Sequence, residues 1–266
     1  MSRLARPGCE LHWDEQGEGS PVLLIMGAMY SSRMWYPTLP TLVRHHRAVW
    51  FDNRGIGRST GTAVASIEDM ADDALAVMDA AGLATAHVYG ISLGGVVALE
   101  VAKRAPERVR SLVLGCTCVL TRDKPRAPVE LNDVLATASR ADYVASTVYG
   151  SVCPPEAKEL NARELLADTA DPVSLVAQQD ALRAYAADLD DVRALTVPSL
   201  VLHGDEDPVV PVEWGRELAA TLPRSALVVY GGTGHNYPLE QGDRANEDVL
   251  AFLAGVDAAR QPVSAE

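Results

Sequence analysis

Short apolar runs without polar alternation recur along the chain, and they constrain its fold more than any other feature. Runs of this kind are typical of strands that are buried on both faces of a parallel sheet. The six runs are Val22–Met26, Ala48–Phe51, His87–Tyr89, Val109–Leu114, Ser199–His203 and Ala226–Tyr230. A weaker, amphipathic strand is predicted ahead of them, near Cys9–Trp13.

Segments with helical periodicity lie between these runs. Apolar residues recur at i, i+3 and i+4 over residues 67–78, and Ser66 with Asp69 resembles a capping box that starts a helix. The segment Leu93–Arg104 is apolar almost all round, which predicts a deeply buried helix. Further helices are predicted at Val212–Thr221 and Ala245–Leu253. This alternation predicts an α/β fold with a mostly parallel central sheet flanked by helices.

The alternation stops between about Val119 and Val197. This stretch contains five prolines and short Ala- and Leu-rich helical segments, but no clear strand. We therefore expect residues 1–118 and 198–266 to form the core, and residues 119–197 to form a helical cap. Since the insertion follows one strand and precedes the next, it should emerge at the carboxyl ends of the strands and cover that edge.

Charge and composition exclude several classes of protein. The net charge is −13 over 266 residues, so phosphate backbones and anionic lipid surfaces are repelled. No apolar stretch approaches the ~20 residues of a membrane helix, and no signal peptide is recognisable at the start. Four cysteines without a C-x-x-C pair indicate neither a zinc nor a redox site, and a cytoplasmic location is expected. No metal-ligand cluster is evident, and formation of a homodimer is left open.

The pattern G-x-S-x-G occurs at Gly90–Gly94, between a predicted strand and the buried helix. In this context a serine lies on a sharp strand-to-helix turn, with its hydroxyl exposed above the sheet and close to the positive end of a helix. Ser92 is therefore predicted to be a nucleophile.

A serine hydroxyl needs a base, and the base needs a carboxylate that orients it. Asp207 follows the strand Ser199–His203, and His235 follows the strand Ala226–Tyr230. Both therefore fall at the carboxyl ends of strands, where open α/β sheets place ligands. Asp205 is a second candidate for the acid, although its side chain is also placed to cap the turn.

Together with these residues, two further segments make the chain resemble the α/β-hydrolase family. They are Met26–Met29 and Asp52–Ser59. The resemblance is to the small cofactor-free serine hydrolases, which include carboxylesterases, enol-lactone hydrolases, C–C bond hydrolases and perhydrolases. The order Ser92, Asp207, His235 matches the family order. The resemblance implies an α/β-hydrolase fold, and the Asp52–Ser59 segment is interpreted as a structural Asp/Arg network.

The resemblance also implies the roles of the site residues. Ser92, Asp207 and His235 would form a catalytic triad, and the backbone N–H groups of Ala28 and Leu93 would form an oxyanion hole. Met26 stands where the family usually has His, which leaves the support of the Ala28 loop unexplained. The expected reaction is hydrolysis of an ester or lactone of a small apolar substrate through an acyl-enzyme, without a cofactor. The alternatives are a C–C bond hydrolase or perhydrolase on the same triad, and a non-catalytic ligand receptor or pathway cyclase.

Apolar and aromatic residues near the catalytic loops and in the cap are predicted to contact the substrate. They are Met29, Tyr30, Tyr143, Tyr149, Val209 and Tyr237. The remaining histidines are assigned structural roles: His45 and His46 are expected at an exposed helix end, and His12, His87 and His203 within strands.

Overall fold

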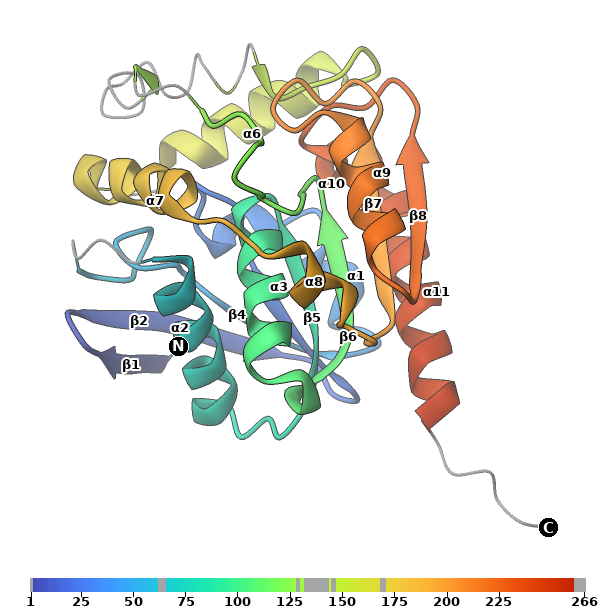
Figure 1. Ribbon diagram of the computed structural model, residues 1–266. Coiled ribbons are helices and arrows are strands. Elements are labelled where there is room, and N and C mark those ends of the chain that lie inside the picture. The colour runs from blue at the N-terminus through green and yellow to red at the C-terminus, as the bar shows by residue number, and fades with distance from the viewer. Residues whose placement is uncertain are drawn as a thin grey trace.

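A single eight-stranded sheet runs through the molecule (Figure 1). The computed structural model describes residues 2–61, 66–127, 130–131, 144, 147–167 and 171–260. The strands are β1 (Ser2–Arg6), β2 (Cys9–Gln16), β3 (Pro21–Ile25), β4 (Arg47–Phe51), β5 (Ala86–Ile91), β6 (Val109–Gly115), β7 (Ser199–Gly204) and β8 (Ser225–Tyr230). Their order in the sheet is β1-β2-β4-β3-β5-β6-β7-β8. Strand β2 pairs antiparallel with both β1 and β4, and the pairs from β4 to β8 are all parallel. The predicted α/β fold with a mostly parallel sheet is confirmed.

Strand β1 is the one element of the sheet that the sequence analysis did not predict. Its five residues alternate between half-buried and exposed, and it pairs only with β2 at the sheet edge. Arg3 and Arg6 interrupt any apolar run, as is common in edge strands that must not pair with other molecules. An edge strand of this kind has no buried run from which it can be recognised.

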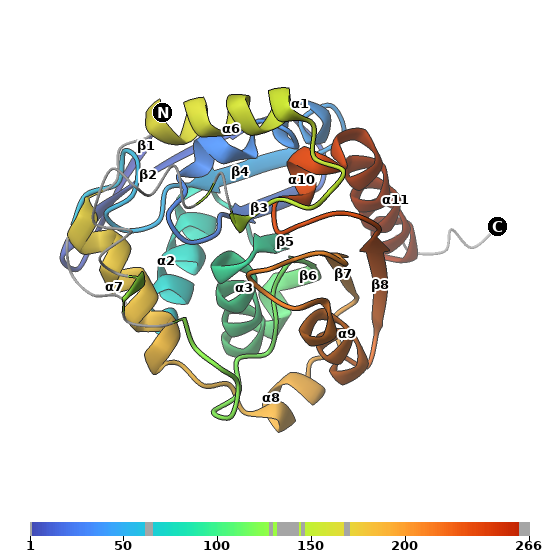
Figure 2. The same ribbon diagram turned by 90° about the horizontal axis from the view of Figure 1, so that it is seen from above.

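Helices cover both faces of the sheet (Figure 2). One face carries α2 (Ile67–Ala80), α3 (Leu93–Arg104), α8 (Leu189–Arg193) and α9 (Val212–Thr221), and the other carries α1 (Leu39–Leu42) and α11 (Gly242–Arg260). Short helices η1 (Ser32–Trp35), η2 (Pro106–Arg108) and α10 (Tyr237–Glu240) connect them. The predicted capping box is present, since Ser66 Oγ accepts from Asp69 N at 3.1 Å and the Asp69 carboxylate accepts from Ser66 N at 3.1 Å.

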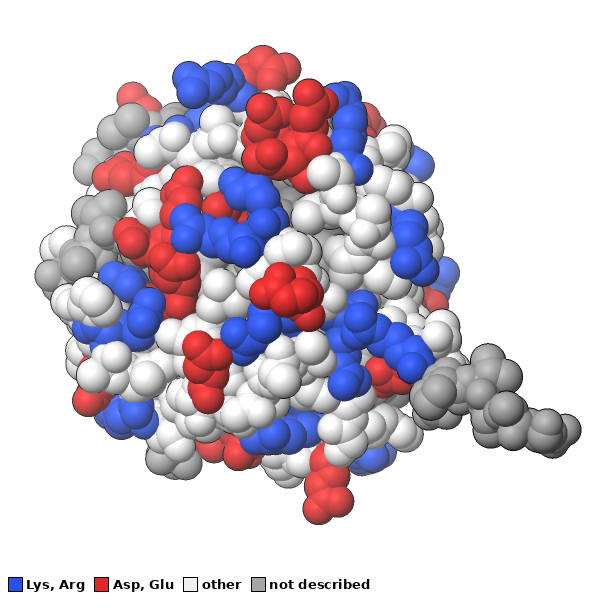
Figure 3. Space-filling view, turned by 60° about the horizontal axis from the view of Figure 1, so that its bottom comes forward, with Lys and Arg blue, Asp and Glu red and all other residues white. Residues whose placement is uncertain are grey.

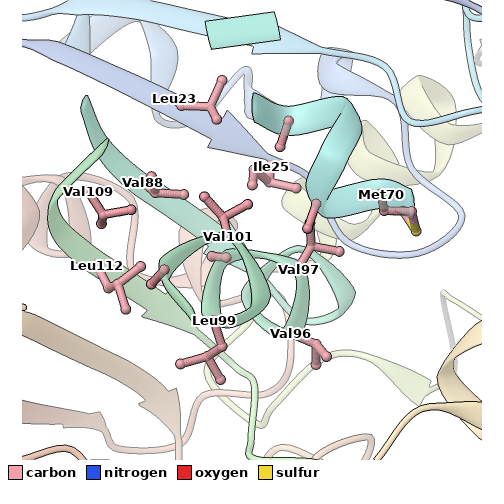
Figure 4. Close-up of a cluster of buried hydrophobic side chains, with 14 of the residues drawn as sticks. Leu23, Ile25, Met70, Val88, Val96, Val97, Leu99, Val101, Val109 and Leu112 are labelled. Carbon is pink, nitrogen blue, oxygen red and sulfur yellow. The ribbon is translucent and has the colours of Figure 1, made fainter. Parts of the chain in front are cut away.

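The largest hydrophobic cluster lies between the sheet and helices α2 and α3 (Figure 4). Side chains from β3, β5 and β6 meet the buried face of α3, where Val97 and Val101 are fully inaccessible. Burial of each such side chain contributes about 1.5–3 kcal/mol to stability. This packing fixes the position of the amino terminus of α3, next to Ser92.

The expected cap is divided between two places in the structure. Helices α6 (Pro155–Ala167) and α7 (Pro172–Ala184) lie above the carboxyl ends of the strands (Figure 1). An ion pair of 2.8 Å between Arg33 and Glu164 ties α6 to the core. Helix α8, which also falls within residues 119–197, packs instead with α3 and α9 in the layer beside the sheet.

The Asp52–Ser59 segment forms a structural network, as expected. The Asp52 carboxylate is fully buried and accepts from Ser32 N at 2.8 Å, Arg58 N at 2.9 Å and Arg58 Nε at 3.1 Å. Arg54 reaches a different acid, Asp73 of α2, through its NH2 group at 2.8 Å. These contacts fix the loop after β4 beneath the cap.

Acidic and basic side chains are interspersed on the face shown in Figure 3. The net charge of −13 is therefore not gathered into one acidic patch on that face. Among the described helices, none combines the length and apolar character needed to cross a membrane.

Candidate active site

Ser92 occupies a strained turn between β5 and α3. Its backbone has φ +54° and ψ −120°, a conformation that side-chain-bearing residues rarely adopt. Gly90 and Gly94 make the turn possible, because a Cβ atom at either position would lie about 2 Å from a backbone oxygen. The Ser92 N–H donates to Gly115 O of β6 at 2.8 Å. The hydroxyl is thus held at the carboxyl edge of the sheet, as the G-x-S-x-G pattern predicts.

His235 is oriented by Asp207. The distance from His235 Nδ1 to Asp207 Oδ2 is 2.7 Å, and Asp207 Oδ1 accepts from Val209 N at 2.8 Å and Val210 N at 2.9 Å. Burial of the carboxyl would by itself raise its pKa, but the His235 and His203 rings and the Val210 N–H hold the pKa of Asp207 well below its usual range. Asp207 is therefore an ionised acceptor that fixes the imidazole.

The second candidate acid has a different task. Asp205 Oδ1 accepts from Gly232 N at 2.7 Å, which joins the loop after β7 to the loop after β8. It binds backbone rather than the imidazole. Of the two carboxylates, Asp207 alone contacts His235 among the described hydrogen bonds.

Two further side chains surround Asp207. His203 Nε2 lies 3.4 Å from Asp207 Oδ2 and donates to Val210 O at 2.8 Å. One ligand atom each of Cys116, Asp207 and His235 lie within 4.8 Å of one another, a spacing that a metal ion accepts. Burial raises the pKa of the Cys116 thiol well above its ordinary value, however, and Asp207 already bonds His235. Because metals bind the thiolate, this donor set fits a packed thiol behind Asp207 and His235 better than a metal site.

A cavity of about 700 Å³ opens at this edge of the sheet. Both Ser92 and His235 line it, and so do Ala28 and Leu93, the predicted oxyanion-hole residues. The loop that carries Ala28 lies against Ser92, since a Cβ atom at Gly27 would be 3.3 Å from Ser92 Cβ. The arrangement places the predicted nucleophile, the predicted base and two candidate N–H donors around one space.

The loop after β3 has support that the sequence analysis missed. Asn53 Nδ2 donates to Met26 O at 3.1 Å, and the side chain of Gln178 in α7 accepts from Met29 N at 3.0 Å. These two amides support the loop in which the usual His is replaced by Met26. Asn53 was visible as part of the Asp52–Ser59 segment, but nothing in the sequence pattern singles out Gln178.

The cap also holds the loop of the predicted base. Val148 O accepts from His235 N at 2.7 Å and from Asn236 N at 3.2 Å. The half-buried Glu240 carboxylate accepts from both Gly234 N at 3.1 Å and Gly150 N at 2.9 Å. Backbone on both sides of His235, the predicted base, is therefore bonded directly or indirectly to residues 148–150.

The predicted substrate contacts divide into three groups. Met29, Tyr30 and Val209 line the cavity. Tyr237 and Tyr149 are absent from its lining: Tyr237 is fully buried with its hydroxyl 2.6 Å from that of Tyr89, and the Tyr149 hydroxyl accepts from Asn161 at 2.7 Å. Both phenol groups are thus engaged in packing, so the expectation of substrate contact is corrected for them. Tyr143 lies outside the described residues.

Other cavity-lining residues were not predicted. From the cap and its stem come Arg126, Val148, Gln179, Leu182 and Arg183, and Trp214 comes from α9. His46 also needs a correction. It is buried rather than exposed, and its Nδ1 atom lies 2.9 Å from Ser20 Oγ.

The chain matches a family model described as "Serine aminopeptidase, S33" over residues 21–242. It belongs to this α/β-hydrolase family. The match covers the whole segment from β3 to the start of α11, and with it all three residues of the predicted triad.

Individual α/β-hydrolases are similar over nearly their whole length. A putative carbamate hydrolase, RutD, from Variovorax paradoxus is 31% identical over 95% of this chain and 99% of its own. A non-heme haloperoxidase from Rhodococcus erythropolis is also 31% identical, over 94% of this chain and 97% of its own. The structure of a thermophilic esterase from Thermogutta terrifontis has a TM-score of 0.85 at 29% identity, covering 96% of this chain and 99% of that one.

Proposed function

We propose that this α/β-hydrolase cleaves an ester bond, including the cyclic ester of a lactone, in a small and largely apolar substrate. One observation carries the proposal. Ser92 and His235 line the same cavity, and His235 Nδ1 is held 2.7 Å from a buried, ionised Asp207. A positioned base beside a strained serine is the arrangement that nucleophilic acyl transfer needs.

The roles follow from this geometry. Ser92 Oγ attacks the acyl carbon while the free nitrogen of His235 takes its proton and later delivers it to the leaving alkoxide. Asp207 stabilises the imidazolium that forms. The N–H groups of Ala28 and Leu93 bind the oxyanion of the tetrahedral intermediate. Water then attacks the acyl-enzyme with His235 as the base, which releases the acid and restores Ser92. No cofactor takes part in these steps.

The substrate class is inferred from the cavity. Its lining includes Met29, Leu182, Val209 and Trp214, whose side chains favour an acyl chain or ring over a charged group. A volume of about 700 Å³ is in the range of pockets for small molecules. The esterase from Thermogutta terrifontis supports the same bond type.

Hydrolysis of a carbamate is the second candidate, and the similarity to the putative carbamate hydrolase favours it. A carbamate differs from an ester by a nitrogen on the acyl carbon, so the same triad would form a carbamoyl-enzyme. The perhydrolase alternative is favoured by the similarity to the haloperoxidase, with hydrogen peroxide replacing water in the second step.

Turnover of matched substrates tests these candidates. We expect hydrolysis of p-nitrophenyl butyrate, slower turnover of the matched p-nitrophenyl carbamate, and labelling of Ser92 by a fluorophosphonate. Preferred turnover of the carbamate would reassign the bond type. A protein that neither labels nor hydrolyses would favour the non-catalytic receptor or cyclase.

A further inference from the structure

Met29 has an unusual backbone conformation in the loop after β3. Its φ angle is +72°, in the left-handed region that non-glycine residues rarely occupy. A residue held there costs about 1–3 kcal/mol relative to a relaxed conformation. The Met29 peptide unit directly follows Ala28, whose N–H is proposed to bind the oxyanion. Contacts that hold Met29 in place therefore bear on the geometry of the oxyanion hole.

Gln178 of helix α7 makes such a contact. Its Oε1 atom accepts from Met29 N at 3.0 Å, although the two residues lie 149 positions apart in sequence. The Gln178 side chain is buried, with only 5% of the residue exposed. Because Gln178 belongs to α7, this hydrogen bond joins the cap directly to the loop after β3. We call this loop, residues 26–29, the oxyanion loop.

The same face of α7 is docked at two other points. Ser174, one turn earlier, donates to Gly61 O at 3.3 Å, and Leu175 packs on Ile56 and Met29. Residues 174, 175 and 178 share one face of a helix, since they are spaced by three and four positions. The packing of Leu175 holds Gln178 in register, while Ser174 offers a docking contact that does not touch the loop after β3.

We propose that Gln178 is a positioning residue of this hydrolase, which holds the Met29 peptide so that the Ala28 N–H faces the developing oxyanion. The proposal rests on the oxyanion role of Ala28 in the proposed function. When the bond to Met29 N is lost, the strained backbone is free to relax, and the preceding peptide units rotate with it. Donors that are no longer aimed at the oxyanion stabilise the transition state less, while binding of the neutral substrate is little changed.

The Gln178 amide is not fully satisfied in the fold. Its Nε2 atom is buried without a hydrogen-bond partner among the described residues. An unpaired buried donor is destabilising, so methionine at this position relieves one unmet group while it leaves the Met29 N–H unpaired. Stability and catalysis are therefore expected to respond differently to the change.

Three single variants test the proposal: Gln178→Met, Gln178→Glu and Ser174→Ala. With p-nitrophenyl butyrate we expect Gln178→Met to lower kcat about 10- to 30-fold with KM nearly unchanged, which is less than the ~10²–10³-fold for loss of an oxyanion donor itself. Gln178→Glu keeps an acceptor for Met29 N and should stay within about threefold of the parent rate. Ser174→Ala loosens the docking of α7 and should leave kcat unchanged.

A transition-state mimic provides the second readout. A trifluoromethyl ketone binds as a hemiketal oxyanion, so its affinity should fall in Gln178→Met by the same factor as kcat/KM, while the melting temperature stays close to that of the parent. The proposal would be overturned if kcat fell equally in Gln178→Met and Ser174→Ala. It would also be overturned if Gln178→Met bound the ketone as tightly as the parent does. If Gln178→Met does not fold, Gln178→Asn, which is one methylene too short to reach Met29, replaces it with the same expected result.

Failure of the proposed function gives a different result. The rate at which a fluorophosphonate labels Ser92 depends on the oxyanion hole but not on the natural substrate. If the parent enzyme labels but does not hydrolyse the ester, the labelling rates of the same variants still test Gln178. If the parent does not label at all, the assignment of the triad is wrong whatever the natural substrate is. The proposed role of Gln178 is then wrong as well.

Discussion

Two histidine–aspartate pairs lie at opposite edges of the sheet, and in each a ring nitrogen of the histidine is within hydrogen-bond distance of a carboxylate. At the carboxyl edge His235 Nδ1 lies 2.7 Å from Asp207, and at the amino edge His87 Nε2 lies 3.0 Å from Asp257. The second pair even has a serine, because Ser111 Oγ lies 2.7 Å from His87 Nδ1. Distances thus define a Ser–His–Asp array at the amino edge, and at the carboxyl edge Ser92 lines the same cavity as His235.

The exposed member of the pair is the histidine at the carboxyl edge and the aspartate at the amino edge. In the carboxyl-edge pair the acid side chain is fully buried, and the imidazole, 11% exposed, faces the cavity beside Ser92. In the amino-edge pair the acid is 23% exposed at a surface depression, while His87 and Ser111 are inaccessible. A histidine without access to substrate serves only to bind one part of the fold to another. The two pairs therefore differ mainly in access, and access to a cavity is what the proposed catalytic role of Ser92 and His235 requires.

The largest expected effect comes from the serine and histidine of the accessible array. Ser92→Ala or His235→Ala should lower the rate of ester hydrolysis by about 10⁴–10⁶-fold, and the double variant should be little worse, because the two residues act as one unit. The measurement is kcat/KM on p-nitrophenyl butyrate. Ser111→Ala is the matched control at the other edge, and it should keep the parent rate. Residual activity above a tenth in Ser92→Ala would disprove the assignment.

Substitutions of Asp207 and of Asp257, the acids of the two pairs, should differ almost as much in their effect on kcat. Asp207→Asn is expected to lower kcat about 10⁴-fold, because the amide favours the wrong tautomer of His235. Asp257→Asn and Asp205→Asn should affect the melting temperature rather than kcat. A large loss of kcat in Asp205→Asn with little loss in Asp207→Asn would move the acid to Asp205.

The inaccessible pair should make stability depend on pH. Burial lowers the pKa of His87 to about 4, against an ordinary value of about 6.5. The unfolded chain therefore binds one more proton between these values, so stability is lost as pH falls from about 6.5 to about 4, by up to ~3 kcal/mol. Urea unfolding at about pH 7 and about pH 4.5 measures this.

A His87→Asn variant is the control for this dependence of the unfolding free energy on pH, called the pH slope below. Its free energy of unfolding should fall less between the two pH values, since asparagine does not titrate. Part of the slope should remain, because burial also lowers the pKa of His12 and His46. An unchanged slope would show that His87 is already protonated in the folded state.

The smallest effect is expected on substrate preference. Leu182 lines the cavity at the carboxyl edge, and Leu250 lines the depression at the amino edge. Leu182→Ala should change the ratio of kcat/KM between long and short acyl chains by about tenfold, as about 1–3 kcal/mol per methylene implies. Leu250→Ala should leave the ratio unchanged. Equal effects on all chain lengths in Leu182→Ala would indicate that α7 is scaffold rather than a wall of the acyl site.

The sequence was most informative where local patterns are tied to one backbone geometry. The buried runs located six of the strands and an amphipathic pattern a seventh, and the elbow around Ser92 needs its glycines at fixed positions. The ends of β7 and β8 drew attention to His235 and to two aspartates, and the resemblance to the family favoured Asp207 over Asp205. These features are short in sequence, so a single chain is sufficient to detect them.

Contacts between distant segments could not be predicted in the same way. Gln178 reaches the oxyanion loop over 149 residues, and Val148 contributes a backbone carbonyl, which no residue pattern reveals. His46 lies in a polar stretch but is buried because Ser20 and α11 cover it. Tyr237 adjoins the catalytic loop in sequence, yet its side chain turns into the core toward Tyr89. Each of these depends on how the elements pack, which periodicity alone does not encode.

The pairing of His87 with Asp257 also bears on how the chain folds during its synthesis. Asp257 is made 170 residues after His87, which at ~5–20 residues per second is a delay of roughly 10–30 s. During that time the nascent sheet carries an imidazole at its amino edge that has no carboxylate partner. Helix α11 carries Asp257, which contacts all three of His87, Ser20 and Arg110. The amino edge of the sheet is therefore completed only after the last helix has left the ribosome, so ribosome-bound chains that end before α11 should be more sensitive to proteases than the released protein.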